Sequence, residues 1–258
     1  MRTNELQAIY IMWLRQMKRF LRFKTRLATM VIQPLFFFLL LGSGFRQAVM
    51  PGLEGGYIDF LAPGIVAMAI LFSSMFTGVS VLWDKQFGFL QEVLVAPVSR
   101  FSIIIGRTIG GATTALIQGF IILFIAIILG IKISSGAGLI LTIVFMLLLS
   151  FTAVGFGLII ASKMNDFQSF SLIMNLIIMP LLFLSSAFFP VTQDKTLQTI
   201  AYFNPLFYMI DGLRGSLIGK SNVFPPLIDL IVVCIISVSY THLRAHETSL
   251  HLVCRLLL

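Results

Sequence analysis

Charged residues are scarce in this sequence. Asp, Glu, Lys and Arg make up 11% of its 258 residues, whereas a soluble domain has about 25%. Hydrophobic residues make up 58%, and the mean hydropathy is +1.01. A soluble chain of this length could not bury so many apolar side chains in one core. The composition therefore excludes a soluble globular protein and predicts a chain that folds within a lipid bilayer.

Cysteine and catalytic motifs are also lacking. The two cysteines, Cys234 and Cys254, are too few for a disulfide framework and lack the spacing of metal ligands. The sequence contains no His-Glu-x-x-His and no Gly-x-Ser-x-Gly motif. A stretch from Gly215 to Ser221 resembles a phosphate-binding loop, but only three residues separate its glycines instead of four. We therefore expect no catalytic site, no metal site and no cofactor in this chain.

Long apolar runs are abundant, and five of them are long enough to cross a bilayer as helices. A sixth run begins at Pro226 and fades near Val238, which is too short for a full crossing. The pattern predicts an all-α polytopic membrane protein with six transmembrane helices, the sixth truncated. Together they form a transmembrane domain over residues 27–237, with the five complete spans at about 27–45, 60–82, 108–131, 139–161 and 167–189.

Residues 1–26 precede the first span and have a helical pattern of their own. Trp13 and other large apolar residues fall on one face, and cations recur at steps of three or four on the other. This pattern predicts an amphipathic helix in the membrane interface, with its cations toward anionic headgroups. The segment does not resemble a cleaved signal peptide, so we expect it to be retained. Its cationic face consists of Arg15, Lys18, Arg19, Arg22 and Arg26.

The distribution of basic residues predicts the orientation in the membrane. With the N-terminus in the cytoplasm, the inner segments 1–26, 83–107 and 162–166 carry eleven Lys and Arg residues and the outer segments five. Inner loops of membrane proteins carry the excess of Lys and Arg. We therefore predict a cytoplasmic N-terminus.

The segment 238–258 differs in composition from the rest of the chain. It holds all three histidines, His242, His246 and His251, whose spacings of four and five could suggest a metal site. The stretch closely resembles a translated sequencing-adapter tail found on unrelated reading frames. We therefore expect it to be non-native, with the native sixth span cut at about Ser237.

Two segments between the spans are not explained by simple packing. At about 84–98, Phe87, Leu90, Val93 and Leu94 recur at helical steps until Pro97, which predicts a short amphipathic helix under the membrane. At about 190–224, the apolar residues are too few to span but could form a re-entrant or interfacial element.

Two acidic residues near the outer side merit separate predictions. Asp211 and Arg214 are one helical turn apart, and as an exposed pair they would contribute little stability. Asp229 lies in the sixth apolar run, where a carboxylate is a functional candidate. Because it follows Pro226 so closely, we favour an interfacial position for it over a fully intramembrane one.

At these segments the sequence resembles the membrane subunits of type-2 ATP-binding-cassette (ABC) exporters. The matching stretches are Phe60-Leu-Ala-Pro-Gly64, Gln91-Glu-Val-Leu-Val-Ala-Pro-Val-Ser-Arg100 and Asn204-Pro-Leu-Phe-Tyr-Met-Ile-Asp-Gly-Leu-Arg214. With the order of elements, the resemblance covers about residues 1–237. It implies a coupling helix in the first inner loop that docks into a cytosolic ATPase, and re-entrant helices before the sixth span.

The resemblance also implies roles for particular residues. Glu92 and Arg100 would be the main polar contacts to the ATPase, and the coupling set as a whole would be Phe87, Gly88, Leu90, Glu92, Leu94, Pro97 and Arg100. The outer re-entrant motif would comprise Asn204, Pro205, Tyr208, Asp211 and Arg214. Two permease copies, identical or different, would work with two ATPase subunits, which bind the ATP and Mg²⁺, in a prokaryotic plasma membrane.

The leading hypothesis is thus a permease that exports a hydrophobic drug, lipid or similar substrate with energy from a separate ATPase. A polysaccharide exporter of the same family is the alternative. A membrane-embedded enzyme would need polar catalytic groups at one depth, and the sequence shows none. A channel or secondary transporter would need paired intramembrane charges or an internal repeat, and neither is evident.

Overall fold

A computed structural model describes residues 2–45, 56–89, 93, 95, 98–131, 133–191, 194–219 and 223–237. Within these ranges the only regular secondary structure is helix and there is no strand, which confirms the predicted all-α class. The helices are α1 (Arg2–Arg22), α2 (Lys24–Gly44), α3 (Tyr57–Gln86), α5 (Arg100–Ile128), α6 (Gly136–Lys163), α7 (Phe167–Phe183), α8 (Lys195–Tyr202) and α9 (Pro205–Ile218), followed by an apolar helix, Pro226–Ser237. The tail 238–258 lies outside the described residues.

Three helices are long and apolar enough to cross a membrane: Tyr57–Gln86, Phe101–Ile128 and Gly136–Lys163. They correspond to the predicted second, third and fourth spans. At the other three predicted spans the described apolar stretches are shorter: Ala28–Gly44, which is part of α2, Phe167–Phe183 and Pro226–Ser237. The total of six spans therefore stays a prediction.

The predicted fifth span, 167–189, is longer than the helix found there. Helix α7 ends at Phe183, and the chain then turns through Ser186, whose φ of 60° is unusual for a residue with a side chain. The carbonyls of Ser186 and Phe188 accept hydrogen bonds from Arg214 and Tyr57. The last residues of the apolar run thus form a hydrogen-bonded turn, which apolar character alone does not distinguish from a helix.

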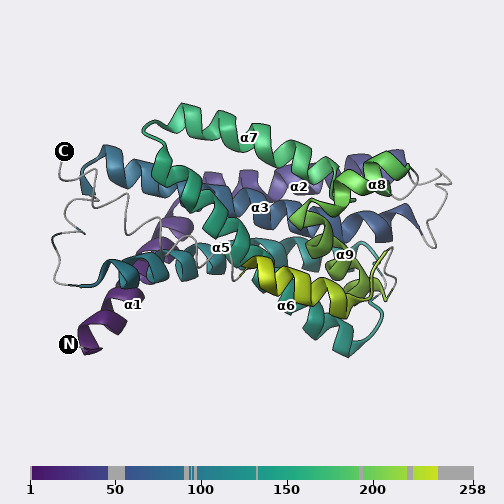
Figure 1. Ribbon diagram of the computed structural model, residues 1–258, viewed down its shortest axis with the longest axis horizontal. Coiled ribbons are helices and arrows are strands. Elements are labelled where there is room, and N and C mark those ends of the chain that lie inside the picture. Colours follow the sequence, from purple (N-terminus) through teal and green to yellow (C-terminus); the bar gives the residue numbers. More distant parts are fainter. Residues whose placement is uncertain are drawn as a thin grey trace.

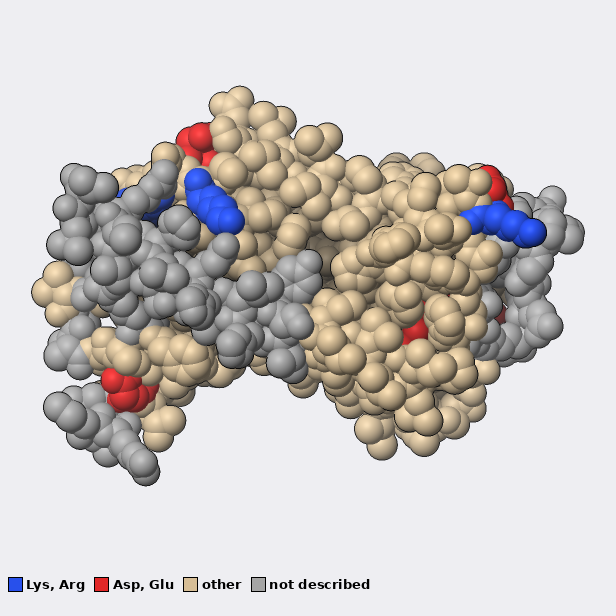
Figure 2. Space-filling model, viewed as in Figure 1, with Lys and Arg blue, Asp and Glu red and all other residues tan. Residues whose placement is uncertain are grey.

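Helix α3 is the centre of the bundle. It packs against α2, α5, α6, α7 and α9. In its most apolar stretch of 18 residues, 83% is buried inside the protein. Figure 1 shows the long helices running side by side, with α1 at one end and α8 and α9 at the other. On the face in Figure 2, coloured charged atoms lie mostly toward the two ends and the surface between is largely uncharged.

The predicted inner segments gather at one end, which we call the α1 end. There α1, the last turn of α3, the first turns of α5 and the turn 164–166 contact one another. The opposite end, which we call the α9 end, contains α8, α9 and the turn 184–190. The predicted topology requires the inner segments to lie together on one side of the membrane. Which end faces the cytoplasm stays a prediction.

Helix α1 is docked on the bundle and does not lie apart from it. It packs along α5, where a Cβ atom added to Gly106 or Gly110 would come within 2.8 Å of Met12 or Gln16. Small residues permit this close approach of two helix backbones. Trp13 also donates a hydrogen bond from Nε1 to Oγ1 of Thr113, at 3.2 Å. The amphipathic helix is therefore in part a structural element of the bundle.

Candidate functional site

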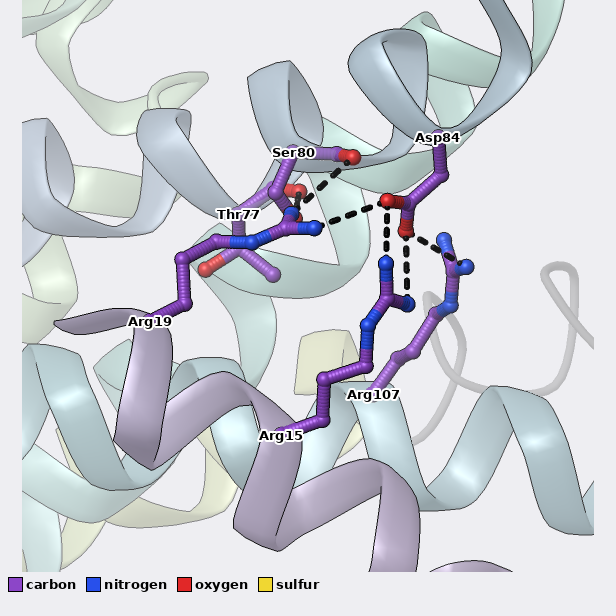
Figure 3. A network of polar contacts seen from close by, with 6 residues as sticks. All are labelled: Arg15, Arg19, Thr77, Ser80, Asp84 and Arg107. Atoms are coloured by element: carbon purple, nitrogen blue, oxygen red, sulfur yellow. Dashed lines mark hydrogen bonds and ion pairs between the residues drawn. The ribbon is translucent and has the colours of Figure 1, made fainter. Parts of the chain in front are cut away.

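A single carboxylate, that of Asp84, joins three helices at the α1 end (Figure 3). Arg15 donates to its two oxygens at 3.1 and 2.6 Å, in a bidentate pair. Arg19 and Arg107 each donate at 2.8 Å. Because Asp84 belongs to α3, Arg15 and Arg19 to α1, and Arg107 to α5, the cluster ties these helices to one point.

The charges of this cluster are unequal, with three guanidinium groups around one carboxylate. The Asp84 side chain is 5% exposed and that of Arg107 is 10% exposed, while Arg15 and Arg19 are 28% and 20% exposed. Charge-assisted bidentate pairs are the stronger class of hydrogen bond. Removing one partner of a buried pair leaves an uncompensated charge, which is strongly destabilising. The cluster therefore depends on Asp84, because that residue is the shared partner of all three cations.

A second contact from α1 is made by Glu5. Its carboxylate accepts hydrogen bonds from the Ser99 backbone amide at 2.9 Å, from the Ser99 hydroxyl at 2.7 Å and from the Ser102 hydroxyl. These hydrogen bonds, with that of Ser102 the largest contribution, hold the pKa of Glu5 below its usual value. Ser99 in turn caps α5, because its hydroxyl accepts from the Ser102 amide.

The two contacts bracket the inner loop, by which we mean residues 87–99 between α3 and α5. Asp84 lies just before this loop, and Ser99 is its last residue. The Arg15 guanidinium also lies 3.7 Å from the ring centroid of Phe89, inside the loop. Helix α1 thus contacts the chain at both ends of the inner loop, at Asp84 and at Ser99.

The second inner segment joins the same end. Lys85 donates from Nζ to the Met164 carbonyl at 3.1 Å and to Oδ1 of Asn165 at 2.9 Å. Gln86 donates to the Asn165 carbonyl at 3.4 Å, and the Trp83 and Phe167 rings are 6.4 Å apart. The turn between α6 and α7 is therefore fastened to the last turn of α3.

The predicted coupling helix, about 84–98, differs from the structure at its first residues. Residues 84–86 belong to α3, which continues one turn beyond the predicted span because Asp84 and Lys85 have partners there. Phe87 follows with 82% of its surface exposed, and Gly88 has a φ of +75°, a conformation that favours glycine. Leu90, Glu92, Leu94 and Pro97 lie outside the described residues, as does the side chain of Arg100, which begins α5.

The predicted interface helix needs a correction as well. Arg15 and Arg19, which we expected to face headgroups, turn toward Asp84, because a buried carboxylate is a better partner than water. Lys18 and Arg22 are exposed, as headgroup contacts would be, and the Arg26 side chain lies outside the described residues. We did not single out Asp84 or Arg107 from the sequence. Their positions could have indicated a shared role, because Asp84 directly follows the predicted span 60–82 and Arg107 directly precedes the predicted span 108–131.

At the α9 end, Arg214 is almost fully buried, at 2% exposure. It donates from Nε to the Phe60 carbonyl at 3.3 Å and from Nη2 to the Ser186 carbonyl at 2.6 Å. Its guanidinium lies 3.9 Å from the Phe60 ring centroid, and Nη1 is 3.9 Å from Oδ1 of Asp211. The prediction that Asp211 and Arg214 are exposed is therefore wrong, because α9 packs with both side chains inside the bundle.

The other residues of the outer motif have structural contacts. Asn204 caps α9 by accepting from the Leu206 amide, and it donates to the Leu181 carbonyl at 2.6 Å. Pro205 occupies the first turn of α9, where a missing amide costs nothing. Tyr208 donates to the Tyr202 carbonyl at 3.0 Å, and Asp211 accepts from the Phe224 amide at 3.2 Å.

Through Arg214, two of the sequence stretches singled out above meet in space. Phe60 supplies a carbonyl and a ring to Arg214, and Gly64, one turn further along α3, packs directly on the Ala187 carbonyl. A side chain at Gly64 would collide with that carbonyl. The stretches 60–64 and 204–214 therefore form one latch at the α9 end, in which α9 lies against α3 and α6.

The described residues contain no group of three or more His, Cys, Asp or Glu side chains that could hold a metal ion. An apolar pocket lies between α3, α6, α7 and α9, lined by residues that include Leu71, Phe156, Met174, Ile178 and Met209. Thr152 is the one hydroxyl residue in its lining. The pocket offers apolar contact and almost no polar chemistry.

Comparison with known proteins finds one family for most of the chain. The family model described as "ABC-2 type transporter" matches residues 7–218. A putative transport permease, ycf38, of Cyanophora paradoxa is 31% identical over 202 residues, which cover 76% of this chain and 70% of that protein. The inner membrane transport permease YadH of Escherichia coli (strain K12) is 27% identical over 235 residues, or 89% of each chain. Nodulation protein J of Rhizobium leguminosarum bv. trifolii is 29% identical over 196 residues, covering 74% and 73%.

Proposed function

The chain belongs to the ABC-2 type transporter family and is a membrane permease of an ABC transporter, and on that premise we propose that it exports a hydrophobic drug, lipid or similar substrate. In the proposed transporter, a separate cytosolic subunit hydrolyses the ATP. The observation that carries the proposal is the family match over residues 7–218, which includes both the inner loop and the latch of Arg214.

The inner loop is the part that we propose to dock on the ATPase. Phe87, at 82% exposure, is an apolar side chain on the α1 end without cover in the described structure. A force on the loop would pass to α3 through Asp84 and to α5 through Ser99, with α1 as a brace across both. The fastened turn 164–166 would carry the same displacement to α6 and α7.

Helix α3 links this end to the other. Its 30 residues correspond to about 45 Å of α-helix. Asp84 stands near its last turn and Phe60 near its first, where the latch of Arg214 holds it. We infer that tilting of α3 by the ATPase moves the latch at the α9 end, so that a cavity between two permease copies opens outward.

The chemistry of the interior supports a hydrophobic substrate over a polysaccharide. The pocket between α3, α6, α7 and α9 has an apolar lining with Thr152 as its hydroxyl residue. With a volume of about 50 Å³ the pocket is far smaller than a drug-sized site of roughly 300 Å³ or more, so it indicates only the apolar character of the interior. A polysaccharide would need many hydrogen-bonding partners along its path.

The test of the coupling role uses Leu90→Ala combined with Glu92→Gln. With the permease reconstituted beside its ATPase subunit, we expect substrate-stimulated ATP hydrolysis to fall about tenfold, because the variant weakens docking at the centre of the contact. The measurement is the ATPase rate with and without substrate. Leu197→Ala with Asp194→Asn, at the α9 end, is the matched control and should keep full stimulation. Full stimulation in the Leu90/Glu92 variant would contradict the proposed docking.

A further inference from the structure

The carboxyl group of Asp229 has no partner in the part of the chain that the structure describes. Asp229 lies one turn into the helix Pro226–Ser237 and is 0% exposed. Neither of its side-chain oxygens accepts a hydrogen bond from a described residue. Asp229 is therefore enclosed by protein, while the interfacial depth favoured by the sequence stays a prediction.

The surroundings of Asp229 are acidic and aromatic. Asp211 and Tyr208, both on α9, interact electrostatically with it. The Tyr208 ring stacks on Phe224 at 5.8 Å, and Tyr202 lies 5.6 Å from both Phe224 and Phe207. The Phe224 amide donates to Asp211, which holds this aromatic cluster beside the two carboxylates.

Neither described cation at this end, Arg214 or Lys195, makes a hydrogen bond or an ion pair with Asp229. Arg214 donates to the Phe60 and Ser186 carbonyls, stacks on the Phe60 ring and lies closest to Asp211. Lys195, on α8, is exposed. An ionised carboxylate that is buried without a cation is very costly, so Asp229 either carries a proton or receives a cation from outside the chain.

We propose that Asp229 binds the positively charged group of an amphiphilic substrate, such as a quaternary ammonium or phosphonium. Asp211 adds negative charge near this carboxyl group. Without substrate, Asp229 holds a proton. On binding, this proton is released to water and the cation takes its place, so the charge of the site is unchanged. The inference rests on the proposed export function and narrows its substrate class.

The test measures binding to the permease alone, in nanodiscs of zwitterionic lipid without the ATPase. The probe is tetraphenylphosphonium, and tetraphenylsilane is its neutral analogue of similar shape. In Asp229→Asn we expect the affinity for tetraphenylphosphonium to fall about tenfold or more, and that for tetraphenylsilane to stay unchanged. The matched control is Asp59→Asn, which removes a partly exposed carboxylate from the first turn of α3, also at the α9 end. It should leave the affinity for both probes unchanged.

A second measurement on the unaltered protein covers the case in which Asp229→Asn does not fold. Tetraphenylphosphonium should bind more tightly as the pH rises, with one proton released for each cation bound, and tetraphenylsilane should bind independently of pH. Equal affinity of the wild type and Asp229→Asn for tetraphenylphosphonium, or binding without proton release, would overturn the proposal. Loss of ATPase stimulation with this binding intact would count against the export function instead.

Discussion

Asp84→Asn is expected to detach α1 from the bundle and to uncouple ATP hydrolysis from transport. The change keeps the shape of the side chain but removes the negative charge shared by Arg15, Arg19 and Arg107. Arg15 and Arg19 lose the charged partner that holds α1, which weakens the attachment of α1 by about 3 kcal/mol, and the largely buried Arg107 lacks a counter-ion. Repulsion among the three guanidinium groups favours release of α1, because α1 carries the two that are more exposed.

Limited proteolysis in nanodiscs measures this release directly. Trypsin cleaves after Arg and Lys, and cleavage within α1 should accelerate on the order of a hundredfold if release costs ~3 kcal/mol less. Asp84→Glu retains the charge and should restore most of the protection. Asp166→Asn is the matched control, because it removes an exposed carboxylate at the same end while asparagine can still cap α7. Protection of α1 in Asp84→Asn equal to that of the wild type would refute the role of the cluster.

Arg214→Met is expected to have an even larger effect on folding. Methionine fills a similar volume but cannot donate to the Phe60 and Ser186 carbonyls or face the charge of Asp211. The unpaired groups are inside the protein, so the free energy of unfolding should fall by about 3–5 kcal/mol. Because Ser186 has a left-handed backbone, loss of its hydrogen bond also frees the turn after α7 to relax.

The measurement is thermal unfolding of the purified protein, with the yield of folded protein as a second readout. Lys195→Met removes an exposed cation from the same end and should leave the unfolding temperature unchanged. Combining Arg214→Met with Asp211→Asn should cost less than the two single changes added, because the double variant leaves no buried charge unpaired. Strict additivity would show that Asp211 and Arg214 do not interact.

The helices of this protein were largely predictable because their signals are local. Apolar runs of sufficient length place α3, α5 and α6. Ser99 and Asp194 each cap the helix that follows, as residues with short polar side chains often do. Asn204 followed by Pro205 marks the start of α9 in the same way. In each case the residues that decide the structure are neighbours in sequence.

The contacts of the two ends were not predictable in the same way because they join distant residues. Asp84 meets Arg15 across 69 positions, and Arg214 meets Phe60 across 154. An arginine next to an apolar helix could equally face a headgroup, a carbonyl or a carboxylate. The choice depends on which helices pack together, and α1 reaches Asp84 because Gly106 and Gly110 let it approach α5.

The enclosure of Asp229 by protein was likewise not predictable from its position in the sequence. A carboxylate close to Pro226, at the start of an apolar helix, has the sequence pattern of an interfacial residue. In the structure α9 lies inside the bundle with Asp211 and Tyr208, and Asp229 is buried near them. The re-entrant segment that we predicted at 190–224 thus forms two helices, α8 and α9, of which α9 packs on α3 and α6 and provides the enclosure.

Photocrosslinking from two exposed phenylalanines tests the central claim, that the inner loop is the docking element for an ATPase. Phe87, in this loop, is 82% exposed, and Phe203, at the α9 end, is 87% exposed. Each is replaced in turn by the photoreactive residue benzoylphenylalanine, in membranes that contain the ATPase subunit. We predict a covalent product with the ATPase from position 87 and none from position 203. A product from position 203, or none from position 87 while the subunits remain associated, would contradict the account.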